Sequence, residues 1–177
     1  MIEVRGAKAG DMLSLSEIDH NYATEYVWQM DLDQEGSQTM VRFRESRLPR
    51  VMTVAYPQSS IELTKTWKKQ AAFLVAHDEE DKLGYISLAS DIAPQSLWVT
   101  SLAVSNLKRR QGIGSQLILA AQSWAIQNGH QRIVLEMQSK NFPAIRFAQK
   151  LAFEFCGYND RYYENQDIAL FFAKQLG

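Results

Sequence analysis

The chain has 177 residues, of which 46% are hydrophobic and 22% are charged, a composition typical of one compact domain that can bury most of its apolar surface. Its 19 basic and 20 acidic residues give a formal net charge of -1, so no chain-wide field attracts nucleic acid or an anionic membrane. We therefore expect a single domain, residues 1–177, that binds neither nucleic acid nor membranes.

The cysteine content and the first residues of the chain indicate where in the cell the protein is expected. Cys156 is the only cysteine, which excludes an intramolecular disulfide framework, and no group of cysteines and histidines has metal-ligand spacing. The opening stretch MIEVRGAKAGDML lacks the layout of a signal peptide, and no apolar run approaches the roughly 20 residues that a membrane span requires. These features predict a cytoplasmic protein without a metal site.

The first half of the chain predicts one helix and several strands. Apolar residues recur at helical spacing after Asp11, a typical N-cap, and predict a helix over residues 11–26. The stretch TMVRFRESRLPRVMTVAYP alternates apolar and polar residues and predicts irregular strands around Pro49. The stretch AAFLVAHDEEDKLGYISLASD then predicts a β-hairpin with an acidic turn.

The second half has stronger periodicity. Residues 96–104, SLWVTSLAV, form a nearly continuous apolar and β-branched run, which predicts a central strand. Residues 114–127 place apolar side chains on one helical face, and the following Asn-Gly pair can end that helix. A strand RIVLEM, a helix with Pro143 in its first turn and two final strands joined by a polar loop complete the chain. This order predicts a mixed α/β sandwich.

The stretch LKRRQGIGS, residues 107–115, connects a predicted strand to a predicted helix. Such a connection presents unpaired backbone N–H groups and the positive end of the helix dipole. Gly112 and Gly114 have no Cβ, so an anion can approach the main chain, and Arg109 and Arg110 can add charge-assisted contacts. The stretch predicts a phosphate site, although a plain turn or a nucleic-acid contact would use the same residues, and its spacing differs from the nucleotide-binding glycine motifs.

Two stretches, LAVSNLKRRQGIGSQLI and LEMQSKNFPAIRFAQKLAFEFCGY, resemble in order and spacing the motifs of the GNAT superfamily of acetyl-CoA-dependent N-acetyltransferases. With YYENQDIALFFAKQL the resemblance covers about half of the chain, and it is similar both to streptothricin acetyltransferases and to ribosomal-protein alanine acetyltransferases. It implies an α/β (α+β) fold with a mixed, mostly antiparallel twisted sheet, flanking helices and splayed central strands. Residues 96–177 would form the acetyl-CoA-binding half, and residues 1–95 the acceptor side.

The resemblance also implies which residues bind acetyl-CoA. The strand around Leu102 would pair its backbone with the pantetheine arm and polarise the thioester carbonyl, and the loop after it would wrap the pyrophosphate. Asn141 would lie beside the pantetheine, with a plain helix cap as the other interpretation. The predicted acetyl-CoA contacts are Leu102, Ala103, Val104, Arg109, Arg110, Gln111, Gly112, Ile113, Gly114, Ser115, Asn141 and Phe147.

Catalysis is where the sequence departs from the family pattern. Counting from Asn141 places Ala148 where family members carry the tyrosine that protonates the leaving thiolate, and residues 99–101 lack the carboxylate that often lies on the central strand. Glu136 is the best candidate base, because burial raises the pKa of a carboxyl group, and Tyr163 is the best candidate acid. A solvent-facing glutamate and an ordinary strand tyrosine are the competing interpretations. No histidine is assigned a catalytic role.

The acceptor side carries weaker signals. Trp28 and Asp31 are candidates to contact a cationic amine, although an exposed acidic turn explains the same residues. The predicted function is direct attack on acetyl-CoA by a primary amine, which a small molecule carries. A protein amino terminus as the acceptor and a CoA-binding module with weak or no turnover are the alternatives. A homodimer is one option for the assembly.

Overall fold

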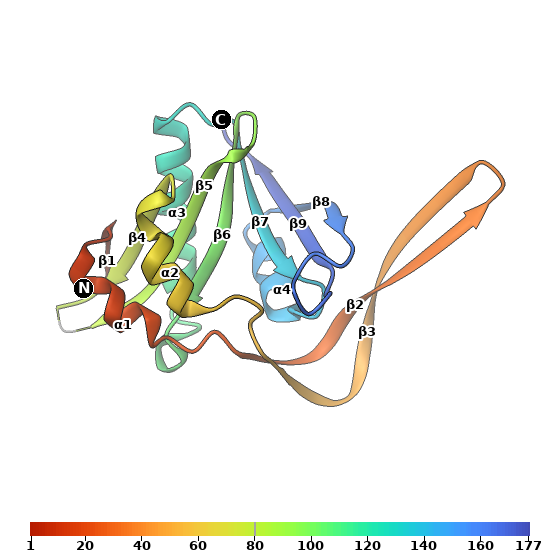
Figure 1. The fold of residues 1–177 in the computed structure, drawn as a ribbon, viewed down its shortest axis with the longest axis horizontal. Coiled ribbons are helices and arrows are strands. Elements are labelled where there is room, and N and C mark those ends of the chain that lie inside the picture. The colour runs from red at the N-terminus through yellow and green to blue at the C-terminus, as the bar shows by residue number, and fades with distance from the viewer. Residues whose placement is uncertain (80) are drawn as a thin grey trace.

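The computed structural model describes residues 1–79 and 81–177. A seven-stranded sheet with strand order β1-β4-β5-β6-β7-β9-β8 forms the body, and all of its neighbouring strands are antiparallel except β6 and β7. In Figure 1, α1 and α2 lie in front of this sheet and α3 lies behind it. The predicted mixed, mostly antiparallel α/β fold is therefore confirmed.

The bounds of the elements follow the chain order. The strands are β1 (Glu3–Gly6), β2 (Tyr22–Glu35), β3 (Gln38–Val54), β4 (Ala72–His77), β5 (Lys82–Ala93), β6 (Ser96–Val104), β7 (Arg132–Gln138), β8 (Glu154–Asn159) and β9 (Ala169–Gln175). The helices are α1 (Met12–Ser16), α2 (Ser60–Thr66), α3 (Ile113–Gln127) and α4 (Phe142–Lys150), with short 3₁₀ turns at Ala9–Asp11, Trp67–Lys69 and Asn106–Lys108. No helix among the described residues is long and apolar enough to cross a membrane.

The two central strands pair along only part of their length. Ser96 of β6 lies opposite Arg132 of β7, and the parallel pairing ends at Val99 opposite Leu135. On its other side β6 stays paired with β5 as far as Val104, with an irregularity between residues 99 and 101. The strands diverge below this point in Figure 1. The predicted splay is thus confirmed, and it turns one edge of β6 toward a gap in the sheet.

Each face of the sheet buries its own core. The larger core packs α3 and α4 on the strands, and its fully buried side chains include Ile86, Leu97, Leu117, Ile118 and Ile145. The smaller core packs α1 against the opposite face through residues such as Leu15, Phe73, Val75 and Tyr85. Burial of one such large apolar side chain stabilises the fold by about 1.5–3 kcal/mol, so both faces hold the helices firmly.

The N-terminal helix is shorter than the spacing of apolar residues predicts. α1 ends at Ser16, and from Tyr22 the chain is a strand in which Tyr22 pairs with Val54. The prediction of a helix to residue 26 is therefore wrong, because pairing with a distant strand outweighs the local periodicity. Asp11 does stand at the N-cap position of α1, but its side chain makes no cap bond there.

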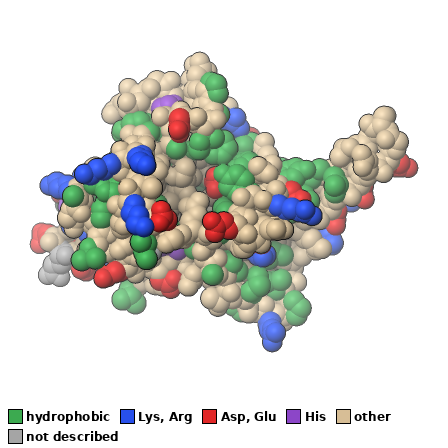
Figure 2. Space-filling model, in the orientation of Figure 1, with side chains coloured by type: hydrophobic (Ala, Val, Ile, Leu, Met, Phe, Trp, Pro, Cys, Tyr) green, Lys and Arg blue, Asp and Glu red, His purple; other side chains and the backbone are tan. Residues whose placement is uncertain are grey.

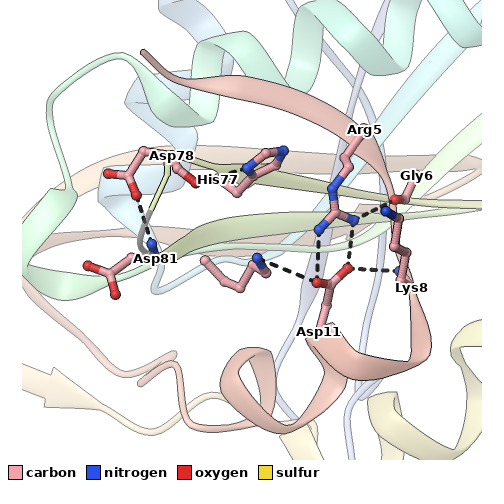
Figure 3. Close-up of polar contacts among 8 residues, drawn as sticks. Arg5, Gly6, Lys8, Asp11, His77, Asp78 and Asp81 are labelled. Carbon is pink, nitrogen blue, oxygen red and sulfur yellow. Dashed lines mark hydrogen bonds and ion pairs between the residues drawn. The ribbon is translucent and has the colours of Figure 1, made fainter.

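A buried ion pair fixes the entry to α1 instead. The Arg5 guanidinium donates to both carboxylate oxygens of Asp11, at 2.7 and 2.9 Å, and the Lys8 backbone N–H donates to the same group at 2.8 Å (Figure 3). The Lys82 ammonium lies 3.7 Å away. Asp11 is only 4% exposed. The Arg5 hydrogen bonds hold the pKa of the Asp11 carboxyl well below its usual range, although burial opposes them.

β2 and β3 form a separate two-stranded sheet that extends from the body past β8 in Figure 1. The pairing shifts between Thr24 opposite Met52 and Tyr26 opposite Arg47, so the irregularity contains Pro49. Proline lacks the N–H that a ladder requires, and such irregularities bend a hairpin. The irregular strands predicted around Pro49 are thus one long strand, and its partner β2 was not predicted.

Candidate functional site

A cleft of about 90 Å³ opens where β6 and β7 diverge. Its walls come from the two strands, from α4, from the segment after β3 and from the β8–β9 loop. The lining residues are Tyr56, Val99, Ser101, Leu102, Leu135, Glu136, Met137, Gln138, Asn141, Ala144, Phe147 and Tyr163. The cleft therefore brings together five of the predicted site residues: Leu102, Glu136, Asn141, Phe147 and Tyr163.

The β6 wall offers backbone groups. Leu102 and Val104 are half-buried and lie beyond Val99, where pairing with β7 has ended. The side chain of Ala103, by contrast, is buried on the α1 face. An extended chain lying in the gap could pair with the β6 backbone as a missing neighbour would, which is the role predicted for the pantetheine arm.

The loop after β6 is shaped for an anion. Arg110 and Gly112 both have positive φ, at 62° and 84°, and Gly112 occupies the N-cap position of α3 without any side-chain cap. A Cβ built on Gly112 meets no atom within 4 Å, so the space in front of the helix end is open. Alternating left-handed residues turn successive N–H groups toward one point, and the first N–H groups of α3 need acceptors. A pyrophosphate fits both requirements.

Gly114 has a different role in the same turn. A Cβ there would lie 3.3 Å from the Phe147 ring, so the missing side chain lets α4 approach the start of α3. Ile113 between the two glycines is buried in the core, and Ser115 is half-buried. Their predicted contribution to acetyl-CoA binding is therefore one of backbone groups. Gln111 is exposed, and its side chain donates to the Leu107 carbonyl at 3.3 Å.

The Arg109 side chain does not point toward the predicted phosphate position. Its guanidinium donates to the backbone carbonyls of Val104 at 3.1 Å, Asn21 at 3.1 Å and Asp19 at 2.7 Å. These three bonds occupy every nitrogen of the group and tie the loop to the segment before β2. The expected charge-assisted contact from this side chain is corrected accordingly, whereas Arg110 is exposed and able to reach an anion.

Asn141 is the N-cap of α4, where its side-chain oxygen accepts the Ala144 N–H at 3.1 Å. The cap interpretation is confirmed, and because Asn141 also lines the cleft, its predicted place beside the pantetheine is retained. Ala148 is fully buried against the core. The position that carries the family's tyrosine is therefore filled by a methyl group, so any hydroxyl in the cleft comes from elsewhere.

Glu136 presents a partly buried carboxylate to the cleft. The Tyr162 hydroxyl donates to its Oε2 at 3.0 Å. Burial raises the pKa of the carboxyl group above its ordinary value, and hydrogen bonds from Tyr162 and Tyr163 oppose the rise. A carboxylate of this kind is a better proton acceptor than an exposed one. The nearby charge and burial also raise the pKa of Tyr162, to about 12, and that of Tyr163 further, so both stay protonated at neutral pH.

The β8–β9 loop that carries Tyr163 is fixed by Asp167. Its carboxylate accepts hydrogen bonds from Gln138 at 2.7 Å, from Asn165 at 2.9 Å and from the Lys140 ammonium. Gln138 in turn accepts the Tyr22 hydroxyl at 2.8 Å, which joins the start of β2 to the floor of the cleft. The loop is thereby held over the cleft by side chains from two strands.

The predicted acceptor contacts lie elsewhere. The Trp28 ring packs on those of Phe172 and Phe155, with centroids 5.5 and 5.9 Å away, and the Trp28 backbone N–H donates to the Ser139 carbonyl. Asp31 accepts from Arg44 at 2.9 Å on the projecting hairpin. Neither residue lines the cleft. Their contact with the acceptor therefore stays a prediction.

The sequence alone missed three residues around the cleft. Tyr56 and Ser101 line it, and the half-buried His20 lies with its ring centroid 4.9 Å from that of Tyr56. Ser101 is a polar residue within an apolar stretch, whereas Tyr56 and His20 have no signal of their own. Among the residues that the structure describes, no group of three or more histidine, cysteine, aspartate or glutamate side chains could hold a metal ion.

Charged side chains of both signs are interspersed on the face shown in Figure 2, as the near-zero net charge suggests. This face has no continuous basic field of the kind that a phosphate backbone attracts. On this face the charges give no sign of a wider basic surface, and an anion site in the loop before α3 stays a prediction.

Known proteins resemble the chain over most of its length. The model of the Acetyltransferase (GNAT) family matches residues 39–153. The streptothricin acetyltransferase of Streptomyces lavendulae is 23% identical over 167 residues, which are 92% of this chain and 86% of that protein. A solved nourseothricin acetyltransferase superposes with a TM-score of 0.85 at 20% identity and covers 99% of both chains. A Bacillus anthracis protein described as a streptothricin acetyltransferase has been solved in complex with acetyl coenzyme A. It superposes with a TM-score of 0.79 at 18% identity and covers 99% of this chain and 100% of that one.

Proposed function

The chain belongs to the acetyltransferase (GNAT) family and is an acetyl-CoA-dependent acyltransferase, and from this premise we propose that it acetylates a primary amine of a small molecule. The observation that carries the proposal is the shared cleft. The free edge of β6 and the Glu136 carboxylate line the same cavity, so a thioester paired with β6 faces a proton acceptor.

Direct attack on the thioester is the chemistry that this arrangement supports. The amine nitrogen forms a bond to the acetyl carbon, and the bond from that carbon to the CoA sulfur breaks. A backbone N–H near Leu102 would stabilise the oxyanion, and the α3 N-terminus would hold the pyrophosphate. Placing the two reactants together contributes about 7–11 kcal/mol to lowering the barrier, which is more than any single side chain supplies.

Protonation must also be managed, because an amine arrives as an ammonium ion with three protons and leaves as an amide with one. We assign the first proton to Glu136, whose raised pKa makes it a suitable acceptor. The ion pair between this carboxylate and the ammonium would also select cationic acceptors. Relatives described as streptothricin and nourseothricin acetyltransferases support an acceptor of small size.

The decisive measurement is release of free CoA thiol from acetyl-CoA in the presence of single acceptors. The panel holds streptothricin-type antibiotics, aminoglycosides, polyamines and peptides with free amino termini. We expect turnover with at least one cationic small molecule, and no turnover when its amines are blocked by prior acetylation.

Other outcomes identify the alternatives. Turnover with peptides alone would replace the small molecule with a protein amino terminus. Tight binding of acetyl-CoA by calorimetry without thiol release across the panel would contradict the proposal and favour a CoA-binding module. A soluble fraction of native cells that contains the protein would support the cytoplasmic location, which we propose from the lone cysteine.

A further inference from the structure

A line of hydroxyl groups connects the cleft to a histidine beside it. The Tyr85 hydroxyl lies 2.9 Å from His20 Nε2 and 3.3 Å from Ser101 Oγ. Ser101 and Tyr56 both line the cleft, so the two hydrogen bonds of Tyr85 lead from His20 to the cleft wall that holds Tyr56. Two hydrogen bonds therefore join three groups from separate parts of the chain, and Tyr56 lines the cleft at the end where Ser101 stands.

The path lies in the interior except at its ends. Tyr85 is 1% exposed and Ser101 is 3% exposed, so water cannot replace either hydroxyl along the way. His20 at one end is half-buried and its ring lies 4.9 Å from that of Tyr56, which lines the cleft at the other end. Buried hydroxyls that are each hydrogen-bonded on two sides can pass a proton by exchanging one bond for the next.

The reaction needs such a path. After Glu136 has taken the first proton, the nitrogen must lose a second one as it attacks, and the departing CoA sulfur must gain one. Ala148 supplies neither acceptor nor donor. A group that accepts the second proton and then returns it would serve both steps, and a neutral imidazole does this in many enzymes.

We propose that His20, Tyr85, Ser101 and Tyr56 form a proton relay for acetyl transfer. The second amine proton passes to the Tyr56 oxygen while the Tyr56, Ser101 and Tyr85 protons each move one place inward, so that His20 Nε2 becomes protonated. When the C–S bond breaks, the same shifts run in reverse and the proton ends on the CoA sulfur. The relay returns to its starting state, and no other reactant is consumed. This inference rests on the proposed function.

The surroundings keep His20 ready to accept. Burial lowers its pKa, the nearby Arg109 guanidinium lowers it further, and only the Asp19 carboxylate raises it. The ring also contacts Tyr56 and Tyr85, which carry no charge at neutral pH because burial raises the pKa of both phenols. His20 is therefore neutral at pH 7, and its tautomer with the proton on Nδ1 leaves Nε2 to accept from Tyr85.

Tyr85→Phe is the sharpest test, because it removes one hydroxyl from the middle of the path and keeps the ring that stacks on Phe73 at 5.0 Å. We expect the single-turnover rate of acetyl transfer to fall about a hundredfold or more, with the acetyl-CoA Kd unchanged within about twofold. His20→Gln should cause a similar loss. In the wild type, protonation of His20 at low pH should lower the rate, because only the neutral ring accepts a proton. The pH profile of His20→Gln should lack this loss of rate and keep only the loss due to protonation of Glu136.

Two further variants separate a relay from a structural role. In His20→Ala, added imidazole should restore part of the rate, whereas it should have no effect on Tyr85→Phe. His130→Gln is the matched control, because His130 also stacks on an aromatic ring, that of Trp124, at the far end of α3. Its rate and pH profile should equal those of the wild type.

The outcomes are distinguishable. If the wild type releases thiol and Tyr85→Phe keeps its single-turnover rate within about twofold, the relay is overturned while the proposed function stands. If Tyr85→Phe loses its fold, judged by circular dichroism, Ser101→Ala replaces it with the same expectation. If the wild type releases no thiol with any acceptor, the proposed function fails and the relay fails with it.

Discussion

The Tyr162 hydroxyl donates a 3.0 Å hydrogen bond to the carboxylate of Glu136, the predicted base. Tyr162, the neighbour of the predicted acid Tyr163, therefore influences the pKa of that base. The bond favours the ionised carboxylate and opposes the effect of burial on its pKa. Burial raises the pKa of Glu136 and the tyrosine hydrogen bonds lower it, and burial is the larger of the two effects.

Tyr162→Phe should raise the pKa of Glu136 further, because the ionised form loses a donor while burial is unchanged. Glu136 must be ionised to accept a proton, so the acidic limb of the pH profile of kcat/KM should move to higher pH. Tyr158→Phe is the control, since this tyrosine lies exposed on β8 and should leave the profile unchanged. A limb that stays in place or moves to lower pH in Tyr162→Phe would contradict the assignment of Glu136 as base.

Glu136→Gln tests the same carboxylate directly. The amide keeps the shape and can still accept from Tyr162, but it cannot take a proton. We expect kcat to fall by a factor of about 10² to 10⁴, the usual contribution of general base catalysis. The acetyl-CoA Kd from calorimetry should stay within about twofold of the wild-type value, because the carboxylate lies on the acceptor side. An unchanged kcat would exclude Glu136 from proton transfer.

The second half of the fold could be predicted because its elements are defined locally. β6 has the bounds that the apolar run of residues 96–104 indicated, and α3 ends beside Gly129, whose φ of 78° matches the predicted left-handed stop. Asn141 caps α4 as its position before Pro143 suggested. In each case the periodicity of the sequence agrees with the face that the structure buries.

The first half depends on pairing between distant segments, and the sequence shows it poorly. Large apolar side chains do alternate along β2, with Tyr26, Trp28 and Met30 on one face. The helical spacing of apolar residues before β2, however, continues as far as Tyr22 and conceals the start of the strand. The path from His20 through Tyr85 to Ser101 joins three separate segments through hydrogen bonds that no local pattern encodes. The cleft therefore contains Leu102, Asn141 and Phe147, which the sequence indicated, and also Tyr56, which it did not.

Gly112→Glu should weaken acetyl-CoA binding. The substitution puts an L side chain at φ +84°, which costs about 1–2 kcal/mol, and places a carboxylate in the open space that the pyrophosphate would occupy. We expect the Kd from calorimetry to rise at least about tenfold. Gly36→Glu is the matched control, because Gly36 also has a positive φ, of 57°, and open space around it but lies at the hairpin tip. Equal affinities in the two variants would place the phosphate site elsewhere.

Asp11→Asn should destabilise the fold without touching the cleft. The Arg5 guanidinium would lose its buried ionic partner, and because Arg5 itself is 27% exposed we expect a loss of about 2 kcal/mol in the free energy of unfolding at pH 7. For a chain of this length that loss lowers Tm by roughly 4–8 °C. Asp33→Asn is the control. It removes the ion pair with Arg42, in which both side chains are more than half exposed, and should lower the free energy of unfolding much less.

The pH dependence of this loss follows from the depressed pKa of Asp11. A carboxyl whose pKa is lower in the folded than in the unfolded chain stabilises the fold above its unfolded pKa, about 3.9, and this contribution disappears as the pH falls toward the folded value. The difference in unfolding free energy between the wild type and Asp11→Asn should therefore be constant from pH 7 to about pH 5 and shrink below about pH 4. Denaturant titrations at pH 7, 5 and 3 measure it. A difference that grows on acidification would show that the ion pair does not lower the pKa of Asp11.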